Sequence, residues 1–564
     1  MSDIKYPRGG YALPASSLNF HTGTWRVQRP VHHRGMAPCQ QACPAGENPQ
    51  AYLARIEEGD ELAAWRELVS VNPLPAVTGR VCPHFCETAC NRGAYDTPIS
   101  IHGVERYLGD KALAHGWGYD LPEVPRDAKR VAIVGAGPAG ISAAYHLTRL
   151  GLKAVIFESS PEPGGTLRAA IPEYRLPRGV LQVEMQRILD NGMEFHGNTR
   201  LGRDVSLAEL HKSHAAVFLG PGTQQAREWH VDGIVQGDLH QALDLLKEWN
   251  TVGKISMPGS VAVVGAGNTA MDTARILRRA GVAQVHLVAH KALPGNGYGH
   301  TDIMPVHPRE IAQALEEGVQ IHPHRGIRRL LLRGERVVGV EMVHMKKLPD
   351  DHGSYSRVAF EGTETVLHVE QVIPAIGQVV DGTGFDALLS GSGFFSVTPG
   401  GAMRTGNRGI FAGGDAIGKG GTVTRAVGDG RRAALAIQAY LQGGELPETQ
   451  SSAVAFDQLN VNYFEPGTRP EDPVLPLKKR VGEKEVVGGI EHQAVLREAQ
   501  RCFSCGNCFA CDNCWTLCPD SSVLKTQELA SDGSHYVFDY DYCKGCGVCA
   551  SECPCGFIVM EPEP

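Results

Sequence analysis

The placement of cysteine constrains this 564-residue chain more than any other feature of its sequence. Five of the 16 cysteines lie between Cys39 and Cys90, eleven lie between Cys502 and Cys555, and the long stretch between these groups has none. A reducing compartment disfavours structural disulfides, so clustered thiols there indicate metal binding or redox chemistry. The sequence therefore predicts metal sites near both ends of the chain and other domains between them.

The C-terminal group contains the run C-x2-C-x2-C-x3-C-P twice. In bacterial-type ferredoxin modules the fourth cysteine of each run ligates the cluster of the other run. We therefore predict two 4Fe–4S clusters, the first on Cys508, Cys511, Cys514 and Cys553, and the second on Cys543, Cys546, Cys549 and Cys518. Zinc knuckles are the alternative, although zinc ribbons need neither the third cysteine nor the trailing proline.

Two central stretches each have the order strand, glycine-rich turn, helix and second strand. Such a turn lets the backbone approach a pyrophosphate at a helix N-terminus, and an acid at the end of the second strand can hold a ribose. The first stretch offers Gly135, Gly137, Gly140, Glu158, Gly164 and Gly165, and the second offers Gly265, Gly267, Asn268 and Ala270. We predict two dinucleotide sites; a glycine turn without a ligand is the alternative for the first stretch.

A later segment, RGIFAGGDAIGKGGTVTRAV at 408–427, resembles the motif by which two-dinucleotide flavoproteins hold the ribitol and pyrophosphate of FAD. The resemblance implies FAD contacts from Gly414, Asp415, Thr422 and Val423. In that family the FAD domain is split in sequence and the nicotinamide domain is inserted within it, so the first fingerprint is assigned to FAD and the second to NAD(P)H. Hydride transfer from nicotinamide to flavin depends on stacking geometry, so no catalytic acid or base is expected.

These motifs predict an α/β fold class. The expected parts are a helical iron–sulfur domain, two Rossmann-like dinucleotide domains with the nicotinamide domain inserted in a split FAD domain, and a ferredoxin-like α+β module. The predicted boundaries are 1–120 for the helical domain, 121–255 and 376–445 for the FAD domain, 256–375 for the nicotinamide domain, 446–500 for a connecting arm rich in Pro, Glu, Gln and Ser, and 501–564 for the ferredoxin module.

The N-terminal cysteines lie in PCQQACP at 38–44 and GRVCPHFCETAC at 79–90, followed by IHGVERYLGD at 101–110. This pattern resembles the cluster domain of the glutamate synthase small subunit, of the large subunit of NADH-dependent ferredoxin:NADP oxidoreductase and of dihydropyrimidine dehydrogenase. IPEYRLPRG at 171–179 and PAIGQ at 374–378 extend the resemblance through residue 445. The resemblance implies a third 4Fe–4S cluster on Cys43, Cys82, Cys86 and Glu105. A carboxylate ligand would lower its potential; a solvated helix glutamate is the alternative for Glu105.

Cys39 and Cys90 are then left without partners. The family usually has R-C-x2-C before the first cysteine pair, but RPVHHRG at 29–35 contains no cysteine. EAQRCFSCG at 498–506 resembles the missing motif, and the ferredoxin clusters do not need its cysteines. The hypothesis is that the arm returns Cys502 and Cys505 to the N-terminal domain, of the same chain or a dimer mate, to complete a fourth cluster with Cys39 and Cys90. An extended arm, at up to about 3.3 Å per residue, can reach; free thiols are the alternative.

The choice of nicotinamide nucleotide is predicted from the residues after the second strand of that domain. NADP-using relatives carry an arginine pair there, whereas this chain has Ala289, His290 and Lys291. Lys291 supplies one charge and a histidine is largely neutral at pH 7. The sequence therefore predicts that NADH is used at least as well as NADPH.

The charge and hydropathy patterns exclude several classes of function. A formal net charge of −8 spread over the chain argues against nucleic acid as the partner. No apolar run approaches the roughly 18 residues that a membrane span needs, and the first residues lack a secretory signal. A cytoplasmic protein without a membrane span is expected.

With its ferredoxin module the chain is similar to the iron–sulfur flavoproteins encoded beside dissimilatory sulfite reductase and to NAD(P)H subunits of 2-oxoacid:acceptor oxidoreductases. This implies an NAD(P)H:acceptor oxidoreductase with FAD and three or four 4Fe–4S clusters. Its partner would be ferredoxin, sulfite reductase or a 2-oxoacid oxidoreductase subunit, and a homodimer is possible. One alternative is a glutamate synthase small subunit, which ordinarily ends after the FAD domain. Another is a non-catalytic subunit that uses clusters as structural staples.

Overall fold

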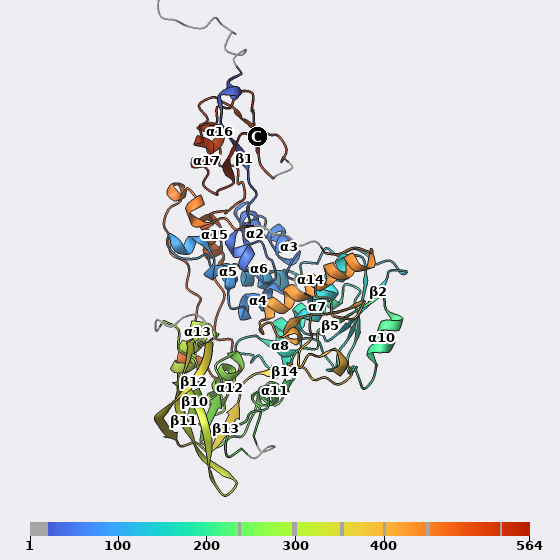
Figure 1. Ribbon diagram of the computed structural model, residues 1–564, viewed down its shortest axis with the longest axis vertical. Coiled ribbons are helices and arrows are strands. Elements are labelled where there is room, and N and C mark those ends of the chain that lie inside the picture. The colour runs from blue at the N-terminus through green and yellow to red at the C-terminus, as the bar shows by residue number, and fades with distance from the viewer. Residues whose placement is uncertain are drawn as a thin grey trace, which may run out of the picture.

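The computed structural model describes residues 21–234, 239–295, 302–349, 355–398, 402–446, 452–530 and 533–564. In Figure 1 the molecule is elongated, with the C-terminal module at one end, a helical domain next to it, and the two domains built on sheets beyond. Over these described ranges, no helix combines the length and the apolar character needed to cross a membrane. The architecture confirms the predicted α/β fold class.

The chain between residues 38 and 115 forms the helical domain. Proline in the first turn starts three of its helices, where a missing N–H leaves no hydrogen bond unmade. Asp60 caps another helix by accepting a hydrogen bond from the backbone N–H of Ala63 at 2.9 Å. Tyr52 and Trp65 are fully buried in its core. The helices are α1 (Pro38–Ala42), α2 (Pro49–Glu57), α3 (Glu61–Val69), α4 (Pro75–Val81), α5 (Phe85–Thr88) and α6 (Ile101–His115).

The FAD-type domain has a five-stranded parallel sheet in the order β15-β5-β2-β3-β4. Strands buried on both faces read as continuous apolar runs, which explains RVAIV in the central strand. The chain leaves this sheet after β5 and returns at β15, so the domain is split as predicted. Its strands are β2 (Arg130–Val134), β3 (Lys153–Phe157), β4 (Glu194–His196), β5 (Ala216–Leu219) and β15 (Ile410–Ala412), and its helices are α7 (Pro138–Arg149), α8 (Thr166–Ala169), α9 (Arg178–Leu189), α10 (Leu207–Ser213) and α14 (Val423–Leu441).

The inserted domain has a four-stranded parallel sheet in the order β13-β7-β8-β9 and a separate antiparallel sheet β10-β11-β12. The chain enters and leaves through a short antiparallel pair, β6 (Gln225–Ala226) with β14 (Gln378–Val379). The other strands are β7 (Ser260–Val264), β8 (Gln284–Val288), β9 (Val319–His322), β10 (Arg325–Arg333), β11 (Arg336–Pro349), β12 (Tyr355–Leu367) and β13 (Gln371–Pro374), and the helices are α11 (Ala242–Val252), α12 (Asn268–Arg279) and α13 (Pro308–Glu316).

The arm, residues 446–500, is packed against both neighbouring domains over its described part. It consists of three 3-10 turns, η8 (Phe456–Gln458), η9 (Val461–Tyr463) and η10 (Leu477–Lys479), followed by α15 (His492–Arg501). Val486 is buried and its N–H donates to the carbonyl oxygen of Tyr174 at 2.9 Å. The side chain of Arg106, in the helical domain, donates to the carbonyl oxygen of Val487 at 2.7 Å. Arg480 of the arm pairs with Glu316 of α13 in the nicotinamide domain at 2.8 Å. The arm therefore connects the FAD domain to the ferredoxin module and contacts the helical, FAD and nicotinamide domains on the way.

The C-terminal module borrows a strand from the start of the chain. β1 (Gln28–His32) pairs antiparallel with β18 (Ile558–Pro562), and Arg26 forms a two-point ion pair with Glu563. This corrects the predicted N-terminal domain of residues 1–120, because residues 22–32 pack on the ferredoxin-like module. An unpaired edge of β18 would leave backbone groups exposed, and β1 satisfies them. The module also contains β16 (Val523–Lys525), β17 (Tyr536–Phe538), α16 (Asn513–Thr516) and α17 (Val548–Ser551).

Candidate cofactor and cluster sites

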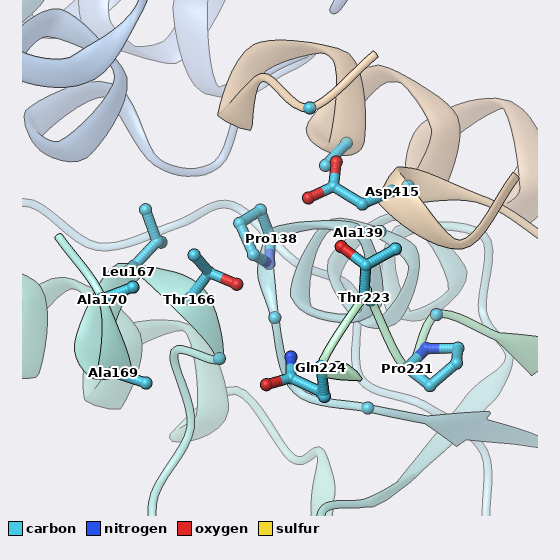
Figure 2. A pocket seen from close by; sticks show the side chains of 18 of the residues that line it. Pro138, Ala139, Thr166, Leu167, Ala169, Ala170, Pro221, Thr223, Gln224 and Asp415 are labelled. Carbon is cyan, nitrogen blue, oxygen red and sulfur yellow. The ribbon is translucent and has the colours of Figure 1, made fainter. Parts of the chain in front are cut away.

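A cavity of about 590 Å³ lies between the two segments of the split domain, at the carboxyl ends of its strands. Figure 2 shows Asp415 on one side and Pro138 and Ala139 of the first glycine turn on the other, with Thr223 and Gln224 nearby. Open α/β sheets bind ligands at this edge. Predicted residues that line the cavity are Gly135, Gly137, Glu158, Gly165, Gly414, Asp415, Thr422, Val423 and, from the inserted domain, Asn268.

The first glycine turn leaves room for a ligand backbone. A Cβ on Gly137 would face open space as far as the Cα of Gly165, 4.0 Å away. Gly140 does not line the cavity; a Cβ there would lie 1.8 Å from the carbonyl oxygen of Gly135, so this glycine permits α7 to pack on β2. The turn therefore has the form of a cradle for a pyrophosphate at the N-terminus of α7.

Glu158 follows β3 and is fixed beside this turn. One carboxylate oxygen accepts a hydrogen bond from the backbone N–H of Ala136 at 2.7 Å, and the other accepts one from Ser160 N–H at 2.8 Å. The side chain is buried but lines the cavity. The oxygen bonded to Ser160 also accepts from the Ser159 hydroxyl at 3.1 Å. The oxygen bonded to Ala136 keeps a lone pair, with which the carboxylate can accept from a hydroxyl group of an adenosine ribose.

Asp415 belongs to the second segment of the split FAD domain and lies near a second acid, Asp429. Burial, and then the charge of Asp429, raise the pKa of Asp415 to about 6. Asp429 accepts a hydrogen bond from the backbone N–H of Gly414 at 3.0 Å. Thr422 caps α14, so the N-terminus of that helix opens onto the cavity. A carboxylate close to a helix N-terminus suits the ribitol hydroxyls and pyrophosphate of FAD, and the residues present fit that group.

The second fingerprint has the same form in the inserted domain. A Cβ on Gly267 would meet no atom within 4 Å, and Asn268 begins α12 at the FAD-type cavity. Ala270 is buried against Gly265, where a Cβ would approach it to 3.0 Å. This turn therefore fits a second dinucleotide whose far end reaches the first. His290 and Lys291 follow β8, away from the cavity.

Arg175 links the two dinucleotide domains and was not among the predicted site residues. It lies in the IPEYRLPRG motif, lines the FAD-type cavity and donates to Asp272 of α12 at 2.7 Å. Burial raises the pKa of Asp272 and the positive charge of Arg175 opposes this effect, so that the pKa is about 6. The available signal was that Arg175 lies within the IPEYRLPRG segment, which carries part of the resemblance to the glutamate synthase small subunit.

The three thiols Cys43, Cys82 and Cys86 lie together with Glu105 in the helical domain. Cys43 and Cys82 end α1 and α4, and Glu105 lies on α6. Burial, and then the Glu105 carboxylate, raise the pKa of Cys82 to about 12. Buried thiols of this kind stay protonated in the absence of a cation and lose their protons when a metal binds, which is what a cluster site requires.

Glu105 is oriented by a buried polar network rather than by solvent. One of its oxygens accepts hydrogen bonds from Asn72 at 3.0 Å and from the hydroxyl of Thr78. Asn72 also donates to Glu47 at 2.8 Å, a second buried carboxylate that the sequence did not indicate. Glu105 is 4% exposed, so it is not a solvated helix glutamate. We call Cys43, Cys82, Cys86 and Glu105 the carboxylate site.

The structure brings Cys39, Cys90, Cys502 and Cys505 to one small cavity, which we call the joint site. Burial, and then Cys90, Cys502 and Cys505 in turn, raise the pKa of Cys39. Asn91 donates to the sulfur of Cys505 at 3.4 Å. All four cysteines belong to the same chain, so no dimer mate is needed to assemble the set.

The arm holds Cys502 at this place through buried polar contacts. Glu498 of α15 is fully buried and accepts a hydrogen bond from Ser100 N–H at 2.6 Å. Arg92 is 1% exposed, forms a two-point ion pair with Asp96, and donates to the carbonyl oxygen of Arg501 at 2.8 Å. The joint site therefore rests on a docked helix and not on a loose tail.

The ferredoxin-like module groups its cysteines as the crossed pairing predicts. Burial, and then Cys511, Cys508 and Cys553, raise the pKa of Cys514 to about 12. Burial, and then Cys543, Cys546 and Cys518, raise the pKa of Cys549 to about 12. Cys518, Cys543, Cys546 and Cys549 also line one cavity. Cys555 lies with its sulfur 3.7 Å from that of Cys553 and lowers the pKa of Cys553, so it is a neighbour of the first set and not an unconnected thiol.

The spacing of these sulfurs does not fit a single zinc ion. Thiolates on one tetrahedral zinc, at about 2.3 Å from it, lie about 3.8 Å from one another. Throughout the part of the chain that the structure describes, no three cysteine sulfurs lie within 4.8 Å of one another. None of the four sets therefore has the sulfur spacing of an assembled single-zinc site.

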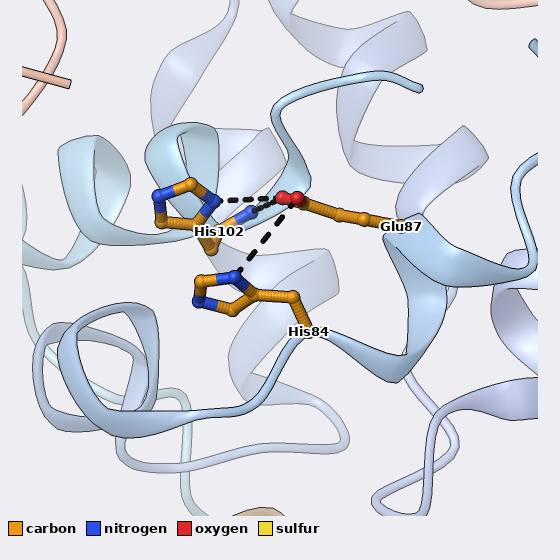
Figure 3. Close-up of side chains that lie close together, drawn as sticks. All are labelled: His84, Glu87 and His102. Atoms are coloured by element: carbon orange, nitrogen blue, oxygen red, sulfur yellow. Dashed lines mark hydrogen bonds and ion pairs between the residues drawn. The ribbon is translucent and has the colours of Figure 1, made fainter. Parts of the chain in front are cut away.

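One further group of ligand-type side chains, His84, Glu87 and His102, lies buried near the carboxylate site. In Figure 3 the Glu87 carboxylate faces both imidazoles, 2.7 Å from His102 Nδ1 and 3.9 Å from His84 Nδ1. Its second oxygen pairs with Arg469 at 2.9 Å, and His102 Nε2 lies 2.9 Å from Asp472. Because these carboxylates are already paired, the group is a charge network between the helical domain and the arm.

Comparison with known proteins gives matches to three family models. The model for pyridine nucleotide-disulphide oxidoreductases matches residues 129–430, that for dihydropyrimidine dehydrogenase domain II with its 4Fe–4S cluster matches residues 28–117, and that for a 4Fe–4S binding domain matches residues 536–559. These ranges cover the two dinucleotide domains, the helical domain and the second ferredoxin run.

Three curated relatives illustrate the range of similar proteins. The NADP(+)-dependent formate dehydrogenase subunit beta of Moorella thermoacetica is 35% identical over 509 residues, which cover 83% of this chain and 70% of the relative. The NADPH-Fe(3+) oxidoreductase subunit beta of Geobacter sulfurreducens is 33% identical over 83% of this chain and 75% of its own length. The glutamate synthase [NADPH] small chain of Escherichia coli is 33% identical over 72% of this chain and 88% of its own.

Proposed function

The chain belongs to the pyridine nucleotide-disulphide oxidoreductase family, and on this premise we propose that it is the nicotinamide-oxidising electron-transfer subunit of a larger redox enzyme. It binds FAD and NAD(P) and carries 4Fe–4S domains. Electrons would pass between NAD(P)H and a low-potential protein partner through FAD and four 4Fe–4S clusters. The proposed ligands are the carboxylate site, the joint site and the two crossed sets of the ferredoxin-like module.

The observation that carries this proposal is an unbroken series of neighbouring redox sites. Val81 and Pro83, which flank Cys82, line the FAD-type cavity. The short helix α1 carries Cys39 near its start and ends on Cys43, so the carboxylate site and the joint site share one helical turn. Cys505 of the joint site is three residues from Cys508 of the ferredoxin module, a span of at most about 11 Å. Without the joint site, this series would have a gap between the flavin and the ferredoxin module.

Each group in the series has a separate task. Bound FAD would supply the exchange between a two-electron hydride and single electrons. Glu158 and the first glycine turn would hold its adenosine half, and Asp415 with the N-terminus of α14 would hold its ribitol and pyrophosphate. Asn268 at the start of α12 places the second nucleotide against the same cavity, where stacking and exclusion of water are what hydride transfer needs.

The partner is proposed from the ferredoxin-like module. Ferredoxin, a sulfite reductase or a 2-oxoacid oxidoreductase subunit would exchange electrons with its clusters. The three relatives named above are subunits or chains of multi-component enzymes, and all three names specify NADP(+) or NADPH, which favours the phosphorylated nucleotide. Sixteen cysteines without a disulfide suit a reducing compartment such as the cytoplasm. A homodimer is compatible with this proposal but is not required by any of the four sets.

A glutamate synthase small subunit remains the second candidate, because the E. coli small chain matches 72% of this chain. That match leaves 28% of this chain outside it. The C-terminal module has two cysteine runs and the borrowed strand β1, which make it an integral part of the structure. An electron-transfer subunit needs such a module, and glutamate synthesis does not supply a reason for it. The first candidate therefore explains more of the chain.

The test combines iron analysis with dye reduction on the reconstituted holoprotein under anaerobic conditions. Replacing Cys502 and Cys505 together with serine is expected to remove about four irons per FAD, since one cubane holds four, and to leave both ferredoxin signals in the reduced-state spectrum. NAD(P)H oxidation by a dye that accepts electrons from the flavin should persist, while reduction of a ferredoxin-type acceptor should fall. Cys555→Ser is the comparison variant: Cys555 is not a proposed ligand but contacts Cys553, so its loss can affect the first ferredoxin signal and should leave the irons of the joint site in place.

Two outcomes would contradict the proposal. Unchanged iron content in the Cys502→Ser, Cys505→Ser protein would remove the joint cluster and with it the continuous series. Absence of any NAD(P)H-dependent dye reduction by fully loaded wild-type protein would support instead a subunit whose clusters are structural.

A further inference from the structure

We propose that Arg357 and Lys291 form a subsite for the 2′-phosphate of the nicotinamide dinucleotide, so that this chain selects NADP(H) over NAD(H). The inference rests on the proposed function and specifies its substrate. Lys291 follows β8, whereas Arg357 lies on β12 of the separate antiparallel sheet. The second cation is therefore supplied by an insertion and lies outside the nucleotide fingerprint.

The position of Lys291 is the first observation. In a dinucleotide domain the residues just after the second strand lie beside the 2′-hydroxyl of the adenosine ribose. Here residues 289–291 follow the carboxyl end of β8. The N–H of Ala289 donates to the carbonyl oxygen of His322 at 3.0 Å, and the N–H of Arg325 donates to the carbonyl oxygen of Ala289 at 2.9 Å. The N–H of Gly265, in the phosphate-binding turn, donates to the last residue of β8 at 3.0 Å. The two parts of a nucleotide site are thus joined directly.

The FAD domain of the same chain provides an internal comparison. Glu158 is the first residue after β3, and it accepts a hydrogen bond from the glycine turn. Ala289 is the first residue after β8 and is completely buried. A carboxylate at this place suits a ribose diol and repels a phosphate, whereas alanine does neither. The first domain is therefore built for an unphosphorylated ribose, and the second lacks the acid that would select one.

Arg357 is held in place next to residues 290 and 291. One terminal nitrogen donates to the carbonyl oxygen of His290, and the other pairs with Asp302 at 3.0 Å. Asp302 is 7% exposed, and the Arg357 side chain is 23% exposed, so the guanidinium is anchored on one side and reaches solvent on the other. A fixed planar guanidinium loses little entropy when it binds a phosphate, which is why arginine is favoured for this task.

The local charge balance favours an anion. Burial, and then the positive charges of Arg357 and Lys347, lower the pKa of Lys291, while Asp302 opposes this effect. The carboxylate of Asp302 is already paired with Arg357, and among the residues that the structure describes no acid forms an ion pair with Lys291 or Lys347. Burial, and then Arg357, lower the pKa of His290 to about 4, so its imidazole is neutral at pH 7. A dianionic phosphate would relieve the repulsion between these cations.

This inference replaces the expectation drawn from residues 289–291 alone. That expectation counted Lys291 as the one charge at the ribose and found no reason for NADPH to be preferred. Arg357 follows Lys291 by 66 positions in sequence, and only the packing of β12 against the end of β8 places the two cations together. The arginine pair of NADP-using relatives is thus represented by one lysine after β8 and one arginine on β12.

The experiment uses the holoprotein and two probes that differ only by the phosphate in question, 2′,5′-ADP and 5′-AMP, titrated by calorimetry. Wild-type protein should bind 2′,5′-ADP at least about tenfold more tightly. Arg357→Gln, which keeps a donor for Asp302, should weaken 2′,5′-ADP binding by about tenfold to a hundredfold, the range for loss of one charge-assisted hydrogen bond. Lys291→Ala should act in the same direction, and 5′-AMP affinity should change little in either variant. The same variants should lower kcat/KM for NADPH and spare that for NADH.

The matched control is Arg328→Gln. Arg328 lies on β10 of the same sheet and pairs with Glu361 at 2.9 Å on the exposed face, so its loss tests for general effects on the insertion. Equal affinity of wild-type protein for the two probes would overturn the proposal, and so would an equal loss for both probes in Arg357→Gln. A phosphate preference in a protein that reduces no dye would contradict the proposed function and leave the subsite standing. Equal use of NADH and NADPH would contradict the subsite and leave the function standing.

Discussion

Arg92 is expected to control the joint site although its side chain is not one of the proposed ligands. We consider Arg92→Met, which keeps an apolar stem against the ring of Phe503 and removes the guanidinium, centred 4.7 Å from that ring. The variant leaves the carbonyl oxygens of Arg501 and Glu465 without this donor. Asp96 keeps a second partner, Arg501, at 3.1 Å.

The magnitude follows from these remaining contacts. Removing one partner of a buried ion pair costs about 3–5 kcal/mol when the other charge is left alone. Asp96 still accepts from Arg501 and from Gly467 N–H at 2.8 Å, so we expect the lower end, about 3 kcal/mol. We call the state in which α15 has left the helical domain the open state. If the lost contacts hold α15 in place, their removal makes the open state about 150-fold more populated.

Hydrogen exchange of α15 and chelator-driven iron release measure this opening. We expect exchange in α15 to accelerate by about a hundredfold, and about four irons to be released faster than the rest. Exchange elsewhere, for example in α7, should keep its wild-type rate, and Arg328→Gln should behave as wild type. If α15 exchanges at the wild-type rate in Arg92→Met, the arm is held by other contacts and the reasoning is wrong.

Three further outcomes are expected. Fully reconstituted wild-type protein should contain about 16 irons per FAD, because four cubanes hold four irons each, and a plateau near 12 by anaerobic iron analysis would exclude the fourth cluster. Gly140→Ala should lose FAD and thermal stability, because the new Cβ would lie 1.8 Å from the carbonyl oxygen of Gly135; normal flavin content and Tm would contradict this. Burial lowers the pKa of His146 to about 3, so the folded protein holds this residue neutral. Its protonation favours unfolding below the ordinary histidine pKa of about 6.5, and stability should fall by about 1.4 kcal/mol per pH unit from there towards pH 3. The Tm difference between pH 7 and pH 5 should be smaller in His146→Asn; an identical difference would rule out this histidine as the cause.

Short-range patterns in the sequence were sufficient for the domain types. The two strand–turn–helix fingerprints and the two ferredoxin runs each lie within about thirty residues, where local geometry decides the outcome. The assignment of Gly137, Glu158 and Asp415 to one cavity followed from such patterns together with the resemblance to split flavoproteins. The crossed grouping of Cys514 with Cys553 also agreed with the rule for such modules.

Residues that act through distant contacts were harder to predict. Glu47 orients the network around Glu105 through Asn72, and no motif contains all three. Arg357 reaches His290 only because β12 folds against the end of β8. The position of Cys502 and Cys505 was reached as a hypothesis, but the choice between the same chain and a dimer mate needed the docking of α15. The missing information was the packing of distant segments within one domain in the first two cases, and the packing of the arm on the helical domain in the third.

The pairing of β1 with β18 also sets the order in which this protein can be completed during synthesis. The residues of the carboxylate site all lie within 43–105, so they emerge from the ribosome long before residue 502 is made, and a cluster there could be loaded early. Cys39 must instead wait for Cys505, and the strand at 28–32 must wait for residues 558–562. Domains generally fold as they emerge, at about 5–20 residues per second, so the helical domain stays open on one side for tens of seconds at least. The cluster proposed at the joint site would therefore be assembled late, and a nascent chain stalled before residue 502 would leave Cys39 and Cys90 without the other two proposed ligands.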